Sequence, residues 1–464
     1  MRMCKLLIFS VFLPISLFAQ SLSQKLDAGI RKLLSDSQGK HAIVALYVVN
    51  AETGKVVYDH NAQVGLAAAS SQKILTSIAA LELLKPSFRF ETALGYTGNI
   101  SSGILNGNLV LTGSGDPTLG SWRYPATKET VLLDNFAKAV KSAGITSISG
   151  NILVDAASWE TQTIPGGWIW DDIGNYYGAG VAALNWRENQ FDLKLKPGRK
   201  EGDPASVVST LPPMYGVHLV SELTTGKRGS GDNAVIYLAP GSTSGVVRGT
   251  IPLGEDPFTI SGAMPDPSVQ FTNTLSSHLN TLNVSIGTLR DSAQFTSQTV
   301  VTNKLLVHQS PPLDSINYWF LKRSINLYGE ALVKTIAFQH SGFGSADTGL
   351  ATIKRFWRER AIDPAEINML DGSGLSPQNR LTAHALTTAM QYARSKPYFT
   401  QFYQALPEIN NLRMKSGSIG GARSFTGYVN GKTGSYTFAI IINGYTGSSS
   451  GIVRQLYNIL DILK

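Results

Sequence analysis

The chain has 464 residues, 43% of them hydrophobic and 16% charged, which is typical of a globular protein and excludes a disordered one. Forty basic and 32 acidic residues give a net charge of +8 without a Lys/Arg-rich run, which argues against a nucleic-acid partner. Cys4 is the single cysteine and the seven histidines form no ligand pair, so we expect no disulfide in the mature chain, no metal and no cofactor.

Residues 1–19 have the pattern of a secretory signal peptide. Arg2 and Lys5 form a basic start, residues 6–18 are an apolar run, and cleavage is expected after Ala19. About 13 apolar residues are too few to span a bilayer comfortably. We therefore expect an exported, periplasmic protein with no transmembrane anchor in the mature chain. An uncleaved anchor is the alternative.

The remaining chain divides by its periodicity into three parts. In 20–88 we predict a helix around Leu26 and Ile30, strands at 42–49 and 55–59, and a helix at 70–84 that Pro86 ends. In 89–304, short β-like runs alternate with turns, and a helix is predicted at 266–280. From 305 we predict helices at 318–338 and 381–395, strands at 414–418, 424–429 and 436–443, and a C-terminal amphipathic helix.

This order of elements predicts an α/β (α+β) protein. A sheet built from both chain ends would be covered by the first and last helices. The segments 20–88 and 305–464 would then form one catalytic domain, and 89–304 would be a mostly β insertion into it.

The first chemical pattern pairs Ser70 with Lys73, which lie one helical turn apart and therefore on one face. A lysine removed from water has a lowered pKa and acts as the base for a serine nucleophile. Backbone N–H groups at the start of the helix stabilise an oxyanion. The same spacing occurs at Ser37 and Lys40, and a helix cap at Ser70 with a solvated Lys73 is the alternative.

Two further patterns suit a peptide substrate, and each occurs more than once. In Ser-x-Asn, the serine hydroxyl could relay a proton and the asparagine carboxamide could hold the amide of the substrate. This pattern occurs at 324–326, 315–317 and 149–151. Lys-Ser/Thr-Gly on a strand suits a carboxylate and occurs at 415–417 and 432–434. Hairpin-turn residues precede Lys432, so the copy at Lys415 is preferred, and there Gly417 would allow a ligand close to the backbone.

In chain order, these patterns resemble those of the active-site serine penicillin-binding and β-lactamase superfamily. Flanking segments resemble the D-alanyl-D-alanine carboxypeptidase/endopeptidase family, the class C low-molecular-mass penicillin-binding proteins. These segments are 68–76, 111–118, 176–179 with 183–185, 310–313, 326–332, 371–376 and 427–429. The resemblance selects Ser324 and Lys415 over their competing copies. One departure is Ser416, where threonine is usual in this family.

The resemblance implies a penicillin-binding/β-lactamase-like transpeptidase domain: an antiparallel five-stranded sheet flanked by helices, with a large insertion. It implies that Ser70 is acylated, that Lys73 is its base and that Ser324 relays a proton to the leaving amine. The implied substrate-binding residues are Asn326, Lys415, Ser416, Gly417 and Ser418, with the N–H groups of Ser70 and Ser418 as the oxyanion hole. The segment 167–172 resembles an insertion segment of this family that contacts the stem-peptide side chain, which implies that Asp172 pairs with the free amine of a diaminopimelate residue; a structural aspartate in a turn is the alternative. We expect Trp168 and Trp170 to be packing residues, and by analogy 371–376 to support the site.

The implied function is an exported serine D,D-peptidase that acts on peptidoglycan stem peptides and their cross-links and is acylated by β-lactams. A β-lactamase or serine esterase is the first alternative, but no Glu-x-x-x-Asn segment stands at the usual place and the long insertion argues against it. A non-catalytic peptidoglycan-binding protein is the second alternative, and the intact set of candidate catalytic and substrate-binding residues argues against it.

Overall fold

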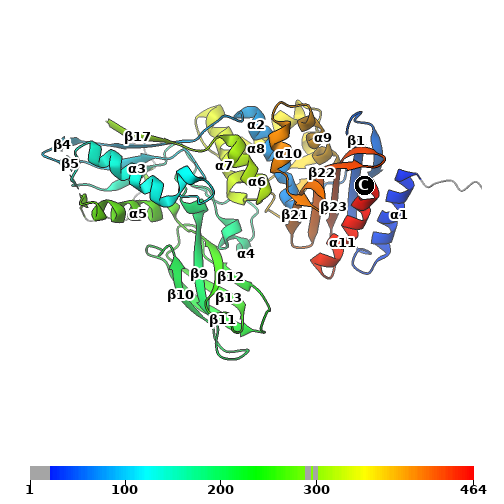
Figure 1. The fold of residues 1–464 in the computed structure, drawn as a ribbon, viewed down its shortest axis with the longest axis horizontal. Helices are drawn as coiled ribbons and strands as arrows, with labels where there is room; N and C mark the ends of the chain where they lie inside the picture. Colours follow the sequence, from blue (N-terminus) through cyan, green and yellow to red (C-terminus); the bar gives the residue numbers. More distant parts are fainter. Residues whose placement is uncertain (1–20, 288–293, 296–300, 302) are drawn as a thin grey trace, which may run out of the picture.

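The structure, a computed structural model, describes residues 21–287, 294–295, 301 and 303–464. The predicted signal peptide at 1–19 lies outside the described residues. Figure 1 shows an elongated molecule, with one mixed α/β body near the C-terminus, a second body built around α3 and α5 at the other end, and a small β lobe below. Among the helices described, none is long and apolar enough to cross a membrane.

The larger body is built on a six-stranded sheet with the strand order β2-β1-β23-β22-β21-β20. All neighbouring strands are antiparallel. Its strands are β1 (Ile43–Asn50), β2 (Val56–His60), β20 (Glu408–Ile409), β21 (Leu412–Ile419), β22 (Ala422–Gly431) and β23 (Gly434–Asn443). The five expected strands are present, and the two-residue β20 extends the sheet by one. Because β1 pairs with β23, the two ends of the chain share this sheet.

Alternating side chains along the strands divide the sheet into two buried faces. On one face, Leu46 and Val48 pack with α1 (Leu22–Ser35) and α11 (Ser449–Leu460), the predicted first and last helices. On the other face, Ala45 and Tyr47 belong to a second core, which another group of helices covers. Those helices are α2 (Lys73–Leu83), α6 (Leu313–Lys322), α7 (Asn326–Ser341), α8 (Ala346–Arg358), α9 (Ala383–Arg394) and α10 (Phe399–Ala405).

The prediction of one continuous helix at 318–338 was wrong, because the helical conformation is interrupted between α6 and α7. Ser324 has φ = 57°, in the left-handed region that non-glycine residues seldom adopt, and α7 begins two residues later. Phe320 on α6 and Leu327 on α7 are both buried in one core. The apolar periodicity therefore continues across the break and conceals it.

The body around α3 and α5 contains two sheets, with strand orders β16-β8-β6-β3-β17 and β15-β7-β5-β4. Its helices are α3 (Glu129–Ser142), which the sequence did not predict, and α5 (Pro267–Thr281), close to the predicted 266–280. Its strands are β3 (Glu91–Tyr96), β4 (Asn99–Ser101), β5 (Ile104–Asn106), β6 (Leu109–Thr112), β7 (Ser147–Ile148), β8 (Ile152–Asp155), β15 (Ser285–Ile286), β16 (Gln294–Phe295) and β17 (Asn303–Gln309). Residues 306–309, assigned from sequence to the catalytic domain, pair with β3.

The β lobe consists of two three-stranded sheets, β10-β9-β14 and β11-β13-β12. Its strands are β9 (Gln190–Lys196), β10 (Ser206–Leu211), β11 (His218–Gly226), β12 (Asn233–Tyr237), β13 (Ser244–Pro252) and β14 (Phe258–Ala263). The short helix α4 (Trp170–Ile173) contacts β12, where the Trp170 and Tyr237 rings lie 5.9 Å apart. A further pair of two-residue strands, β18 (Ile367–Asn368) and β19 (Arg380–Leu381), flanks the turn at 371–376.

Candidate active site

A cavity of about 820 Å³ collects most of the residues that the sequence singled out. Its lining includes Ser70, Asp172, Ser324, Asn326, Ser416 and Ser418. These residues come from α2's N-terminal end, α4, the α6–α7 break and β21, so the fold assembles one site from distant parts of the chain.

Ser70 lies in a short 3₁₀ turn, Ala69–Gln72, that leads directly into α2. Ala69, the residue before it, has φ = 47°, so the backbone turns sharply just ahead of Ser70. Backbone strain of this kind costs free energy and persists only where the surrounding structure enforces it. The turn leaves the Ser70 hydroxyl at the cavity wall while the first residue of α2, Lys73, is buried.

The Lys73 amine has three acceptors around it. Its Nζ lies 2.8 Å from the Oγ of Ser70, 2.6 Å from the Oδ1 of Asn326 and 2.7 Å from the carbonyl oxygen of Ser373. Burial lowers the pKa of Lys73 to about 7, although the carboxylates of Asp371 and Glu330 oppose the shift. A neutral amine has two hydrogens, which Asn326 and Ser373 would accept, and its lone pair would then face the Ser70 hydroxyl.

Asn326 is the first residue of α7 and connects Lys73 to the insertion. While its Oδ1 accepts from Lys73, its Nδ2 donates to the carbonyl oxygen of Tyr177, 2.7 Å away. Both ends of the carboxamide are therefore fixed. Ser324, in the left-handed turn just before α7, lines the cavity beside it.

On β21, Lys415 is 1% exposed, and its Nζ donates to the carbonyl oxygen of Ser416 at 2.8 Å. Burial, reinforced by the positive charge of Lys73, lowers the pKa of Lys415 well below its usual value. Ser416 and Ser418 line the cavity. The competing lysine, Lys432, is exposed in the turn between β22 and β23.

Gly417 lies close to the backbone of Ala68 and to the side chain of Ser424. A Cβ at this position would lie 2.2 Å from the carbonyl oxygen of Ala68 and 2.3 Å from the Oγ of Ser424. The missing side chain therefore allows β21 to pack against the turn that carries Ser70.

Asp172, on α4, is half-buried at the cavity wall. Burial raises the pKa of its carboxyl group, and a hydrogen bond from the Tyr177 hydroxyl opposes that shift. A partly desolvated carboxylate in a cavity of this size is suited to binding a cationic group.

The turn at 371–376 supports the site through one fully buried carboxylate. Asp371 accepts five hydrogen bonds of 2.6–3.0 Å, from Gln72 Nε2, Trp168 Nε1, Asn379 Nδ2 and the backbone N–H groups of Gly374 and Ser376. These bonds compensate the carboxylate for lost hydration. They also fix Gln72, the residue just before Lys73.

Sequence reasoning missed other cavity residues. Arg123, Arg323 and Arg423 line the cavity, as does Tyr176. Arg323 directly precedes the Ser-x-Asn pattern and Arg423 follows the Lys-Ser-Gly strand, but neither is part of those patterns, and Arg123 is far from all of them in the sequence. Across the part of the chain that the structure describes, no group of three or more His, Cys, Asp or Glu side chains has the arrangement of a metal site.

Known proteins are similar in sequence to nearly the whole of this chain. The D-alanyl-D-alanine carboxypeptidase of Actinomadura sp. (strain R39) is 27% identical over 468 residues, covering 93% of this chain and 83% of that protein. The D-alanyl-D-alanine carboxypeptidase DacB of Haemophilus influenzae is 22% identical over 430 residues, 87% of this chain and 86% of that protein.

The fold is also that of a solved protein. The crystal structure of penicillin binding protein 4 from Haemophilus influenzae superimposes with a TM-score of 0.78 at 21% identity, covering 93% of this chain and 98% of that one. A second structure of that protein, complexed with a β-lactam, gives a TM-score of 0.74. The model of the D-Ala-D-Ala carboxypeptidase 3 (S13) family matches residues 26–456. The chain therefore belongs to the D-Ala-D-Ala carboxypeptidase 3 (S13) family.

Proposed function

We propose that this chain cleaves the D-Ala–D-Ala bond of peptidoglycan stem peptides through an acyl-enzyme formed on Ser70. The observation that carries the proposal is the Lys73 amine, 2.8 Å from the Ser70 Oγ, with a lowered pKa and two further acceptors for its hydrogens. This is the arrangement of a base beside a serine nucleophile.

In the first step, Lys73 takes the Oγ proton of Ser70 as that oxygen attacks the carbonyl carbon of the penultimate D-alanine. The N–H groups of Ser70 and Ser418 stabilise the oxyanion. The carbon–nitrogen bond then breaks, and Ser324 relays the proton from Lys73 to the leaving amine. Water subsequently hydrolyses the ester, which frees Ser70 and the shortened peptide.

Substrate recognition is divided between two walls of the cavity. On β21, the Ser416 hydroxyl and the positive charge of Lys415 bind the terminal carboxylate. Burial lowers the pKa of Lys415. A carboxylate bound nearby would raise that pKa again and so favour the charged form of the lysine. Asn326 positions the substrate amide, and Asp172 on the insertion pairs with the amine of a diaminopimelate side chain.

We further propose D,D-endopeptidase activity and acylation by β-lactams. A D-Ala–diaminopimelate cross-link also breaks after a D-alanine carbonyl, so the same residues serve both reactions. The β-lactam complex of the Haemophilus influenzae protein supports acylation by this class. The signal-peptide pattern at 1–19 supports export to the periplasm, and the shared sheet supports a catalytic domain interrupted by the insertion.

The test is labelling with fluorescent penicillin, followed by peptide mass spectrometry. We expect label on the Ser70 peptide and none on the Ser70→Ala variant. Ser37→Ala is the matched control, since Ser37 has the same spacing to a lysine, and it should label normally. Equal labelling of wild type and Ser70→Ala would place the nucleophile elsewhere. Repeated turnover of nitrocefin would instead identify a β-lactamase.

A further inference from the structure

Ser324 lies in a turn whose backbone conformation is unusual for a serine. Its φ of 57° is in the left-handed region, between the end of α6 at Lys322 and the start of α7 at Asn326. Such a conformation persists only where the surrounding structure enforces it. The groups that hold α6 and α7 therefore determine where the Ser324 hydroxyl lies in the cavity.

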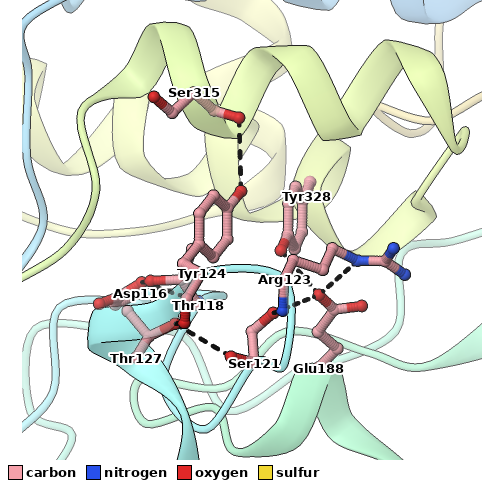
Figure 2. Close-up of polar contacts among 9 residues, drawn as sticks. All are labelled: Asp116, Thr118, Ser121, Arg123, Tyr124, Thr127, Glu188, Ser315 and Tyr328. Carbon is pink, nitrogen blue, oxygen red and sulfur yellow. Dashed lines mark hydrogen bonds and ion pairs between the residues drawn. The ribbon is translucent and has the colours of Figure 1, made fainter.

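The insertion contacts both of these helices, one on each side of the turn (Figure 2). On α7, the hydroxyl of Tyr328, which is 0% exposed, donates to the Oε1 of Glu188 at 2.8 Å. On α6, the carbonyl oxygen of Ser315 accepts from the hydroxyl of Tyr124 at 3.4 Å. Because Glu188 and Tyr124 both belong to the insertion, the insertion bridges the two helices that flank Ser324.

Glu188 is a rigid anchor for Tyr328. Its side chain is 0% exposed, and the same Oε1 also accepts from the Ser121 hydroxyl at 2.7 Å and from the Arg123 Nε at 2.8 Å (Figure 2). The backbone of residues 187–189 is left-handed throughout, with φ between 52° and 54° and no glycine. A carboxylate with three donors on an enforced backbone has little freedom to move.

The segment that supplies Ser121 and Tyr124 is also constrained. It lies between β6 and α3, and its own side chains close its turns (Figure 2). Asp116 accepts from the backbone N–H and the hydroxyl of Thr118, at 2.8 and 2.6 Å. The Thr127 hydroxyl donates to the carbonyl oxygen of Ser121 at 3.1 Å. The insertion therefore presents a preformed support to α6 and α7.

Tyr328 connects this support to the reacting groups. It belongs to the first turn of α7, which begins at Asn326, and Asn326 accepts from the Lys73 amine at 2.6 Å. Burial and the negative charge of Glu188 raise the pKa of Tyr328 well above its usual value, so its hydroxyl keeps its proton and remains a donor. A movement of Tyr328 would displace the start of α7 and, with it, the turn that carries Ser324.

We infer that Glu188, acting through Tyr328, is a positioning residue that holds the α6–α7 turn so that Ser324 can deliver a proton to the leaving amine. The inference rests on the proposed D,D-peptidase function, and it gives the insertion a role in the chemical step as well as in substrate binding. If the bond between Tyr328 and Glu188 only stabilised the fold, its loss would not depend on which bond the enzyme cleaves.

The need for Ser324 depends on the leaving group. When a peptide acylates Ser70, the Ser70 oxygen bonds the carbonyl carbon and the carbon–nitrogen bond breaks. The nitrogen then takes the proton that Lys73 removed, and Ser324 delivers it. When a thioester acylates Ser70, the carbon–sulfur bond breaks and the sulfur leaves with the electron pair as a thiolate, so the proton on Lys73 passes to water instead. A displaced Ser324 should therefore slow the reaction of the peptide much more than that of the thioester.

The test uses two substrates with the same acyl group. One is an acyl-D-alanyl-D-alanine peptide, and the other is the thioester of the same acyl-D-alanine with sulfanylacetic acid, which keeps a terminal carboxylate. We measure kcat/KM, which reports acylation, from the release of D-alanine or of the thiol. In Tyr328→Phe, kcat/KM should fall about tenfold or more for the peptide and about twofold or less for the thioester. Glu188→Gln, which keeps an acceptor oxygen and loses the charge, should lower the ratio of peptide to thioester about threefold.

Two further variants complete the design. Ser324→Ala removes the relay itself and should lower the same ratio at least as far as Tyr328→Phe does. Tyr428→Phe is the matched control, because the Tyr428 hydroxyl is also buried and donates to the carbonyl oxygen of Met390 at 2.6 Å, on β22. It should lower stability and keep the wild-type ratio. Exhaustive labelling with penicillin counts the intact sites, so that each rate is expressed per site.

The outcomes separate the two proposals. An equal loss for both substrates in Tyr328→Phe, or no loss for either, would overturn the inference; if that variant does not fold, the ratio in Glu188→Gln decides in the same way. A wild-type ratio in Ser324→Ala would also overturn it. In each case, D-alanine release by the wild type would leave cleavage through Ser70 standing. If the wild type released no D-alanine from the peptide, the proposed function would fail and this inference with it.

Discussion

Gly417 on β21 lies directly against the carbonyl oxygen of Ala68, two residues before the serine at the cavity wall. A Cβ at position 417 would lie 2.2 Å from that oxygen. The strand and the turn that carries Ser70 are therefore in backbone contact, and any side chain at 417 must displace one of them.

Gly417→Ala should slow acylation by penicillin at least tenfold and lower the free energy of unfolding by about 1–3 kcal/mol, the usual cost of overpacking. Gly166→Ala is the control, since Gly166 is exposed outside the cavity and a Cβ there would meet no atom within 4 Å, and it should behave like wild type. Stopped-flow labelling and urea denaturation measure the two effects. If penicillin labelled Gly417→Ala at the wild-type rate, this contact would not be needed to position Ser70.

The acylation rate should depend on pH through Lys73. Burial lowers the pKa of this amine to about 7, so it is protonated below that pH and cannot accept the Ser70 proton. We expect the rate of penicillin acylation to fall about tenfold per pH unit below this pKa and to level off above it. Labelling rates between pH 5 and 8 give the profile; a flat profile would mean that Lys73 is not the base.

Asp371→Asn should destabilise the protein without removing a reacting group. The substituted amide brings two N–H donors to a buried position where five donors converge, so at least one bond is lost. We expect the free energy of unfolding to fall by about 1–3 kcal/mol. Asp363→Asn, at an exposed carboxylate that caps a short turn, should cost less than about 1 kcal/mol. Equal effects in urea denaturation would contradict the supporting role of Asp371.

Asp172→Asn should affect peptides and penicillin differently. We expect kcat/KM for a peptide with an ammonium-bearing side chain before D-Ala–D-Ala to fall about tenfold, because the neutral amide loses a charge-assisted bond. Penicillin, which has no such side chain, should acylate Ser70 at the wild-type rate. Asp171→Asn is the neighbouring control, since Asp171 bonds Tyr237 in the β lobe. A parallel loss for both ligands would indicate damage to the cavity as a whole.

Local patterns made much of the fold predictable. In the segments that form β1 and β21–β23, apolar residues alternate with polar ones or follow one another without interruption. Ser70 and Lys73 meet because helical spacing brings them together. What the sequence could not indicate depends on distant contacts. Lys73 bonds the carbonyl of Ser373, 300 positions away, and no periodicity encodes such a pair.

The same limit applies to the turns that shape the cavity. Left-handed backbone is usually signalled by glycine, but Ser324 and residues 187–189 adopt it without one. Tertiary packing enforces these turns, so the break between α6 and α7 and the position of Glu188 emerge only from the folded structure.

The contact between the turn that carries Ser70 and β21 joins an early part of the chain to a late one. The hydroxyl of Ser71, next to Ser70, donates to the carbonyl oxygen of Lys415, 344 positions later in the chain. The ribosome therefore makes the serine early and the strand that completes its site almost last. A chain that stops before β21 keeps Ser70 and Lys73 but lacks the wall formed by Ser416 and Ser418. Incomplete products of synthesis consequently lack a finished site.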